Sequence, residues 1–215
     1  MMMMHAYNEL YLNDAMNNLG NMMEYAVYDC GYEPQEFFEE FVSSGIGEKF
    51  GKGNPRYVAG LSGVELVSEV VKKSRDKYLN KPVTYFEFKG KEYWAGWIMA
   101  YYQWYRNMRF EDMIRNGLDM ERVISMYILH EADVSKFVDV ADEIIEKCKK
   151  DKISNLQRIR KFRGITQKKL SEESGVTLRM IQLYEQRQND INKAQAEVVL
   201  RLANVLGCKI EDLME

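Results

Sequence analysis

The sequence predicts an all-α protein made of two helical domains, residues 1–150 and 151–215. Only three of its 215 residues are proline, so few positions interrupt a helix. Apolar residues recur at helical spacing through most of the chain, and only residues 82–88 have the composition of a β-strand. One short run cannot form a sheet, so we expect this stretch to be extended or to be a lone hairpin edge.

Charge is distributed unevenly between the two expected domains. The whole chain has a net charge of −3, while the segment from Asp151 onward carries +3 and residues 1–150 carry −6. Such asymmetry indicates domains with different partners. The three cysteines, at positions 30, 148 and 208, are scattered, which is typical of reduced thiols in a cytoplasmic protein. Neither a transmembrane run nor a signal peptide is expected from the sequence.

The first 60 residues predict two helices followed by a connector. Helical spacing of apolar residues covers residues 5–29, and Pro34 precedes a second helix with Phe37, Phe38 and Phe41 on one face. The glycine-rich segment 45–56 is expected to be a loop. It does not fit a phosphate-binding loop, because its glycine spacing is one residue too long and no strand precedes it.

A third helix is expected to begin at Ser62, where Ser62 and Glu65 have the spacing of a capping box. The next helix lies within residues 93–110 and is rich in aromatic residues. Its Trp94, Trp97, Tyr101 and Trp104 share one face, which favours a packed core. The alternative is a partner-binding face formed by Trp97, Tyr101 and Trp104, because tryptophan and tyrosine concentrate at interfaces. We expect some of these rings to be buried and at least one of Tyr101, Tyr102 and Tyr105 to be exposed or at an interface.

Two further helices, near 119–129 and 132–149, are joined at His130. His130-Glu131 does not begin a metalloprotease motif, because no second histidine follows at the required spacing. The chain shows neither a nucleophile–base pair nor a set of metal ligands, so we expect no enzyme, no metal and no cofactor. An active site near residues 45–56 and His130 remains the enzymatic alternative.

The last 60 residues show the pattern of five short helices. Polar residues stand where helix N-caps are expected, at Ser154, Thr166, Thr177 and Asn192. Glycines stand where helices are expected to end, at Gly164, Gly175 and Gly207. The apolar residues expected to face inward are Leu156, Ile159, Phe162, Leu170, Val176, Ile181, Tyr184, Ala196, Val199, Leu200, Leu202, Ala203 and Leu206. Two short helices about the turn at Gly175 make a helix-turn-helix.

This segment resembles the phage-repressor and Cro type of helix-turn-helix domain, the XRE family. The matching positions, over about 60 residues of in-register sequence, are Thr166, Gln167, Leu170, Gly175, Val176, Thr177, Ile181, Tyr184, Glu185, Leu202, Ala203, Leu206, Gly207, Ile210 and Leu213. The resemblance implies a five-helix, lambda-repressor-like DNA-binding domain, whose third helix enters the major groove.

The resemblance also assigns roles to individual residues. Thr166 and Gln167 match the phosphate-clamping start of the second helix, and Lys193 matches a basic residue that reaches the DNA backbone. Arg160 and Glu185 match a buried structural ion pair. The outward face of the recognition helix matches Thr177, Leu178, Arg179, Gln182 and Leu183.

Leu178 and Leu183 depart from the family pattern, because polar base-reading residues are common at their positions. A leucine can contact a thymine methyl group but cannot read hydrogen-bond donors and acceptors, so Arg179 and Gln182 are the expected base readers.

Residues 1–150 contain five short motifs, at residues 29–31, 44–46, 53–60, 97–104 and 130–133. In these motifs they resemble the helical domain of bacterial antitoxin-like regulators, which implies a protein partner such as a toxin. We therefore expect a homodimeric transcriptional repressor that binds double-stranded DNA and regulates its own operon. The alternative is an interaction or antitoxin module in which the leucine-bearing helix no longer reads DNA.

Overall fold

The computed structural model describes residues 5–76, 79, 81–84, 89–151 and 153–215. These residues form helices and contain no strand, and they divide into two compact units, residues 1–145 and 146–215. Residues 82–84 have no regular secondary structure, while residues 85–88 of the expected extended run lie outside the described residues. None of the described helices combines the length and the apolar character that a membrane crossing requires.

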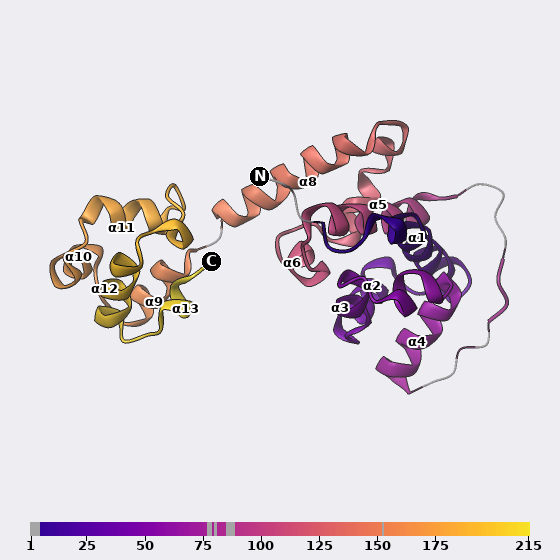
Figure 1. The fold of residues 1–215 in the computed structure, drawn as a ribbon, viewed down its shortest axis with the longest axis horizontal. Coiled ribbons are helices and arrows are strands. Elements are labelled where there is room, and N and C mark those ends of the chain that lie inside the picture. The colour runs from indigo at the N-terminus through magenta and orange to yellow at the C-terminus, as the bar shows by residue number, and fades with distance from the viewer. Residues whose placement is uncertain (1–4, 77–78, 80, 85–88, 152) are drawn as a thin grey trace. The chain divides into compact units, whose positions relative to one another are not determined.

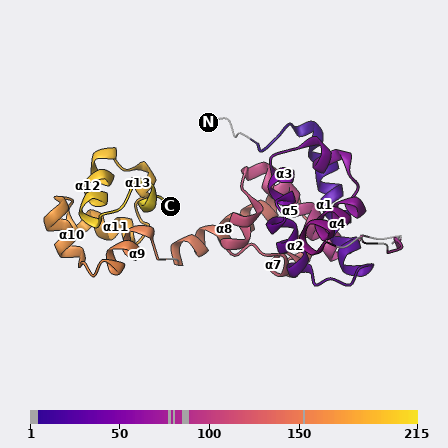
Figure 2. The same ribbon diagram turned by 90° about the horizontal axis from the view of Figure 1, so that it is seen from below.

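Figure 1 labels most α-helices of the first unit, and Figure 2 labels α7. The helices of this unit are η1 (Glu9–Tyr11), α1 (Leu12–Tyr28), α2 (Pro34–Ser43), α3 (Ile46–Gly51), η2 (Arg56–Gly60), α4 (Gly63–Arg75), α5 (Lys91–Arg106), α6 (Phe110–Arg115), α7 (Met120–Ser125), η3 (Tyr127–Glu131) and α8 (Val134–Asp151). Helix α8 begins in the first unit, and its residues from Glu146 onward belong to the second. Here η2 is a short π-helix, whereas η1 and η3 are 3₁₀ turns.

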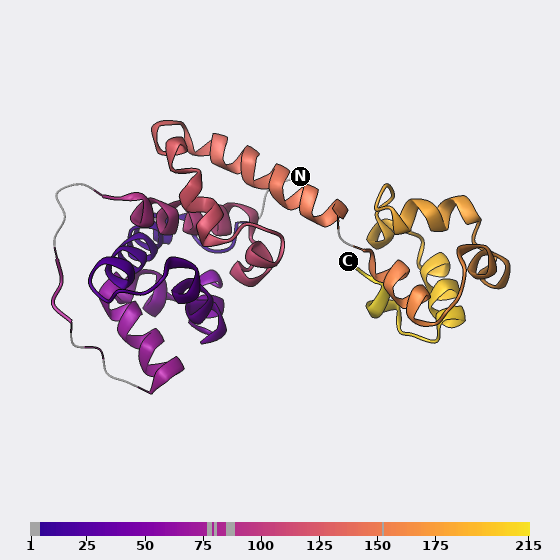
Figure 3. The same ribbon diagram turned by 180° about the vertical axis from the view of Figure 1, so that it is seen from behind.

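Helix α1 is the centre of the first unit and packs against both α5 and α4 (Figure 3). Glycines on these neighbours allow very close contact. A Cβ at Gly96 of α5 would lie 2.4 Å from the carbonyl oxygen of Leu19, and one at Gly63 would lie 2.5 Å from the amide nitrogen of Met22. The two neighbouring helices therefore meet the backbone of α1 directly, where any side chain beyond hydrogen would collide.

Helix α3 corrects the expectation of a loop over residues 45–56. Ile46 and Phe50 are fully buried, and their spacing of four residues gives this short segment a helical apolar face. The two glycines with a left-handed backbone lie outside the helix: Gly45 precedes it with φ +75°, and Gly53 follows it with φ +70°. The glycine content suggested a loop. The burial of Ile46 and Phe50 instead stabilises a helix between the turns at Gly45 and Gly53.

The capping box at the start of α4 is confirmed. The Ser62 hydroxyl accepts a hydrogen bond from the Glu65 amide at 3.3 Å, and the Glu65 carboxylate accepts one from the Ser62 amide at 2.8 Å. These contacts satisfy two N–H groups that the helix itself cannot.

We expect Ser62→Ala to lower the free energy of unfolding of the first unit by about 1 kcal/mol, because it removes this cap. Denaturant unfolding followed by tryptophan fluorescence measures the loss, since all three tryptophans, at 94, 97 and 104, lie in the first unit. Ser62→Asp is the control, because aspartate also caps helices well. Equal losses in the two variants would contradict the capping role.

The second unit contains α9 (Asn155–Phe162), α10 (Gln167–Ser174), α11 (Leu178–Glu185), η4 (Ile191–Lys193), α12 (Ala196–Leu206) and α13 (Ile210–Leu213). Figure 2 shows α10, α11 and α12 grouped together, with α9 and α13 completing the unit. Their buried side chains form a core separate from that of the first unit, built around Leu156, Leu170, Ile181, Val199, Leu202, Leu206 and Leu213.

Three of the N-caps expected in this unit are present. The hydroxyls of Ser154, Thr166 and Thr177 each accept a hydrogen bond from the main-chain N–H three residues later, over 3.1–3.3 Å. Asn192 was wrongly expected to cap the fourth helix. It lies in η4, its side chain binds the main chain of Glu215, and α12 begins only after Gln195.

Three apolar residues expected to face inward are exposed instead. Phe162 is 86% exposed, because six residues after Leu156 places it roughly 120° around the helix, while Arg160 occupies the buried face. Leu200 is 46% exposed, since it follows the buried Val199 directly and points roughly 100° away. Ala196, the first residue of α12, is also exposed.

Candidate nucleic-acid interface

Helices α10 and α11 form a helix-turn-helix. Helix α10 ends at Gly175, which adopts φ +65°, and the buried Val176 then leads into the cap residue Thr177. The Ser171 hydroxyl donates to the carbonyl of Val176 at 2.7 Å and fixes the turn. A left-handed conformation costs little only for glycine, so any other residue at position 175 would strain the turn between the two helices.

A buried ion pair holds α9 to α11. The Arg160 Nε donates to the Glu185 carboxylate at 2.5 Å, and its second guanidinium nitrogen donates to the other oxygen at 2.9 Å. The two side chains are only 10% and 1% exposed. The hydrogen bond to Glu185 raises the pKa of Arg160 above its ordinary value. A third donation, to the carbonyl of Ile165 at 2.6 Å, attaches the same side chain to the segment before α10.

Gln167 is also part of this network, a role that the sequence did not indicate. Its side-chain nitrogen donates to Glu185 at 2.7 Å, so the Glu185 carboxylate accepts hydrogen bonds from both Arg160 and Gln167. One amide hydrogen of Gln167 is thereby engaged within the protein, and the second remains available to a phosphate. The exposed Thr166 caps the N–H of Lys169, and the two N–H groups before it in α10 belong to those that a helix cannot satisfy itself.

The outward face of α11 carries the residues that the resemblance assigns to DNA. Arg179 is exposed, Leu178 is 39% exposed, and Gln182 and Leu183 are half-buried. Arg179 forms neither an ion pair nor a hydrogen bond with any of the described residues. Its guanidinium is therefore not held by the second unit itself.

Lys193 lies at the end of η4 with its side chain 85% exposed, and its ammonium is 3.4 Å from the carboxylate of Asp190. An exposed pair of this kind contributes little to stability, so Lys193 can exchange Asp190 for a phosphate at small cost.

Arg187 is a structural residue that the sequence did not reveal. It follows α11 with φ +55°, an uncommon conformation for a residue other than glycine. Its guanidinium donates to the carbonyl of Lys149 at 2.7 Å and pairs with the Glu215 carboxylate, all within the second unit. It thus connects the turn after α11 to the end of α8 and to Glu215.

The aromatic face of α5 is only partly available to a partner. Trp97 and Tyr101 are half-buried, but Trp104 is 5% exposed, so its assignment to a partner surface was wrong. The indole of Trp104 donates to the carbonyl of Tyr7 at 2.8 Å, and the ring of His5 stacks on it at 3.9 Å. Residues near the start of the chain therefore cover this ring, a long-range contact that helical periodicity cannot predict.

None of Tyr101, Tyr102 and Tyr105, of which at least one was expected to be exposed or at an interface, is fully exposed. Tyr102 is fully buried and donates to Asp142 at 2.7 Å, while Tyr101 and Tyr105 are half-buried and stack on each other at 5.7 Å. His130 is exposed, and its ring stacks on Tyr127 at 4.2 Å. In the part of the chain that the structure describes, no group of three or more acidic, histidine or cysteine side chains is arranged to hold a metal ion.

Residues 156–213 match a family model described as helix-turn-helix. The second unit therefore carries a helix-turn-helix domain of the XRE type, the kind found in DNA-binding transcriptional regulators. No curated protein and no solved structure matches the chain. The family match is confined to the second unit and does not extend to the helices of residues 1–145.

Proposed function

We propose that the chain is a sequence-specific transcriptional repressor that binds DNA as a homodimer. The observation that carries this proposal is the exposed Arg179 on α11, whose helix is fixed to α9 and α10 by the buried Glu185 network. A long forked cation on a rigid recognition helix can reach the edge of a guanine in the major groove. One such helix contacts few base pairs, so two half-sites about one helical turn apart provide the specificity.

The pair Leu178 and Leu183 supports a second candidate, a protein-interaction module without base readout. Both are at least partly accessible on the same face as Arg179, and apolar side chains there suit a protein surface as well as thymine methyl groups. The two candidates differ in their dependence on salt, because phosphate binding releases counterions and weakens steeply as salt rises.

The deciding experiment presents the purified full-length chain with sheared genomic DNA and sequences the retained fragments. We expect a small set of enriched sites with two-fold symmetry and affinity that falls steeply with salt concentration. The absence of any enriched sequence, with no salt-dependent retention, would leave the interaction module as the better description.

Lys193→Ala measures the contribution of a phosphate contact. We expect it to weaken binding to enriched and random DNA by the same factor and to reduce the slope of log affinity against log salt by about 1. Lys136→Ala is the charge-matched control, because Lys136 is an exposed lysine of the first unit. We expect this variant to leave the slope unchanged. Equal slopes for the Lys193 variant and the unaltered protein would remove Lys193 from the interface.

An antitoxin role is the narrower form of this proposal. It rests on the resemblance of the first unit to antitoxin-like regulators and on the partly accessible Trp97 and Tyr101. It requires that the adjacent gene encode a toxin whose growth arrest is relieved when the two genes are expressed together.

A further inference from the structure

The end of α8 carries lysines that no role assigned above uses. Four of the seven residues 146–152 are lysine and two are acidic. Lys147 and Lys149 are exposed, and neither ammonium group has an acidic partner among the described residues. Both belong to the second unit but precede the family match, which begins at residue 156. A cation without a partner is available to a phosphate of DNA.

A chain of contacts fixes the end of α8 to the turn that follows the recognition helix α11. The Arg187 guanidinium donates to the carbonyl of Lys149 at 2.7 Å and pairs with the carboxylate of Glu215. The main chain of Glu215 in turn forms hydrogen bonds with the side chain of Asn192 at 3.1 and 3.4 Å. Lys193, the phosphate contact proposed above, follows Asn192 directly. The main chain of Lys149 is thus joined, within the second unit, to the segment that carries Lys193.

Arg187 and Glu215 are more shielded from water than a surface ion pair. Their side chains are only 18% and 19% exposed, and the Glu215 carboxylate also accepts a hydrogen bond from the Asn155 amide at 2.8 Å. A shielded, charge-assisted contact of this kind is weakened less by salt than a surface pair. The main chain from which the Lys149 side chain extends is therefore fixed before DNA binds, which reduces the ordering that binding requires.

Lys147 and Lys149 extend from different sides of α8, because residues two positions apart in an α-helix are separated by about 200° around its axis. Arg187 binds the carbonyl of Lys149, so this lysine extends from the point at which α8 is held. We therefore expect Lys149, rather than Lys147, to contact DNA together with Lys193. Lys147 is then a matched control, since it is an exposed lysine of the same helix and the same unit.

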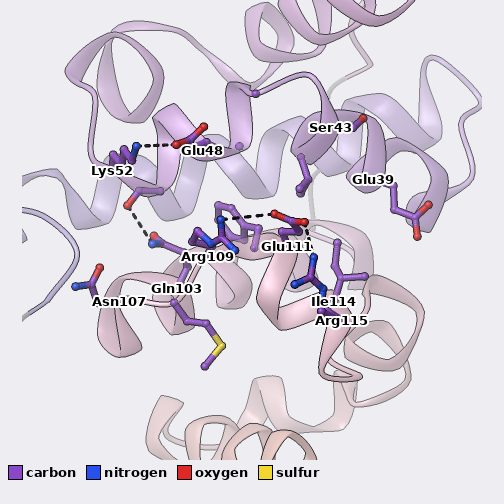
Figure 4. A pocket seen from close by; sticks show the side chains of 16 residues that line it. Glu39, Ser43, Glu48, Lys52, Gln103, Asn107, Arg109, Glu111, Ile114 and Arg115 are labelled. Carbon is purple, nitrogen blue, oxygen red and sulfur yellow. Dashed lines mark hydrogen bonds and ion pairs between the residues drawn. The ribbon is translucent and has the colours of Figure 1, made fainter. Parts of the chain in front are cut away.

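A cavity of about 720 Å³ in the first unit shows the contrast with a surface that suits DNA (Figure 4). It is lined by α2, α3, the end of α5 and α6. Six charged residues line it, three of them basic and three acidic: Lys52, Arg109, Arg115, Glu39, Glu48 and Glu111. The Lys52 ammonium is 2.6 Å from the Glu48 carboxylate, a pair that Figure 4 shows as a dashed line. Because its charges are balanced, this lining does not attract a polyanion.

We propose that Lys149 binds a phosphate of the DNA backbone and that Arg187 positions it for this contact. The DNA-binding surface then extends from the helix-turn-helix, across the segment with Lys193, to the end of α8. This inference rests on the DNA binding proposed above and adds a contact outside the family match, which covers residues 156–213. A phosphate contact carries no sequence information, so Lys149 contributes equally to the binding of any duplex.

The test measures the affinity of the purified full-length chain for an enriched and a random duplex between about 50 and 200 mM salt. We expect Lys149→Ala to weaken both equally and to reduce the slope of log affinity against log salt by about 1. Lys147→Ala is the matched control and is expected to leave the slope unchanged. An unchanged slope for Lys149→Ala, or equal reductions in the two variants, would overturn the inference.

Lys193→Ala separates the failure of this inference from that of the proposed function. If Lys193→Ala reduces the slope and Lys149→Ala does not, the chain binds DNA without the end of α8, and only the inference is wrong. If the unaltered chain shows no salt-dependent binding at all, the proposed function fails and the inference fails with it.

Arg187→Asn tests the positioning role. Asparagine adopts the left-handed conformation of this residue, φ +55°, more readily than most residues, so the variant keeps the turn and removes the guanidinium. We expect Lys149→Ala to have little further effect on the slope when it is combined with Arg187→Asn. A reduction of about 1 in that combination would show that Arg187 does not position Lys149. Thermal unfolding followed by circular dichroism establishes that each variant is folded.

Acetylation of lysines with N-hydroxysuccinimide acetate, followed by mass spectrometry, tests the contact in the unaltered chain, without any substitution. We expect the enriched duplex to protect Lys149 and Lys193 from acetylation and to leave Lys147 reactive. If DNA leaves the acetylation of Lys149 unchanged, or protects Lys147 to the same extent, Lys149 does not make the proposed contact.

Discussion

Replacing Glu185 by alanine is expected to lower the free energy of unfolding of the second unit by about 3–5 kcal/mol. The substitution leaves the Arg160 guanidinium 10% exposed without its counter-ion, and it also removes the acceptor of Gln167. A unit of this size has a total stability of roughly 4–10 kcal/mol, so such a loss consumes much of it. We therefore expect the second unit of Glu185→Ala to unfold at a much lower denaturant concentration than that of the unaltered protein.

Circular dichroism combined with tryptophan fluorescence measures this loss separately from the first unit. All three tryptophans lie in residues 1–145, so a helix-unfolding transition without a change in fluorescence belongs to the second unit. Arg179→Ala is the control, because removal of an exposed cation that no described residue pairs with changes stability by less than about 0.5 kcal/mol.

Glu185→Ala both leaves the buried charge of Arg160 without a partner and removes side-chain volume from the core. The double variant Arg160→Met with Glu185→Leu distinguishes these two causes, because it removes both charges and keeps the volume. Since neither charge remains, we expect it to regain most of the stability that Glu185→Ala loses. A loss below about 1 kcal/mol in Glu185→Ala would show that the network does not hold α9 to α11.

Arg179→Ala is expected to reduce affinity for an enriched DNA site about 5- to 150-fold and to change binding to random DNA far less. A bidentate contact between arginine and guanine contributes about 1–3 kcal/mol of discrimination, whereas phosphate contacts carry no sequence information. Arg179 lies in the first turn of α11, two residues after the cap Thr177, and no described residue of the protein holds it in place.

Fluorescence anisotropy with an enriched site and a scrambled duplex measures both affinities. Lys193→Ala serves as the comparison, because its loss is expected to be equal on the two duplexes. Leu178→Ala is expected to cost little unless a thymine methyl group lies beneath it. If Arg179→Ala weakened both duplexes equally, Arg179 would be a phosphate contact and base readout would have to come from Gln182.

The sequence predicted the second unit well because its signals are local. The caps Ser154, Thr166 and Thr177 and the turn at Gly175 act within a few residues of their own positions. The helical period also placed Leu170 and Ile181 in the core. The prediction was wrong where hydrophobicity alone was used to assign a residue to the core. Phe162 is exposed, and Arg160 lies on the buried face of α9 instead.

The first unit was predicted less completely because its decisive contacts are distant in sequence. Nothing near Trp104 indicates that His5 and Tyr7 cover it. Likewise, the cavity beside Gln103 forms only when α3 and α6 meet the end of α5. The family resemblance named the outward residues of α11, but the engagement of Gln167 with Glu185 depends on how α10 packs on α11.

The sharing of one carboxylate by two donors has a consequence for how this sequence can change over generations. Arg160, Gln167 and Glu185 lie on three different helices, yet a substitution at any one changes how much the other two contribute to stability. Glu185 cannot be replaced first without leaving a buried cation, and Arg160 cannot be replaced first without leaving a buried anion. Descendants of this chain therefore keep or change Arg160 and Glu185 together, whereas the exposed Arg179, which no described residue holds, can be replaced without disturbing this network.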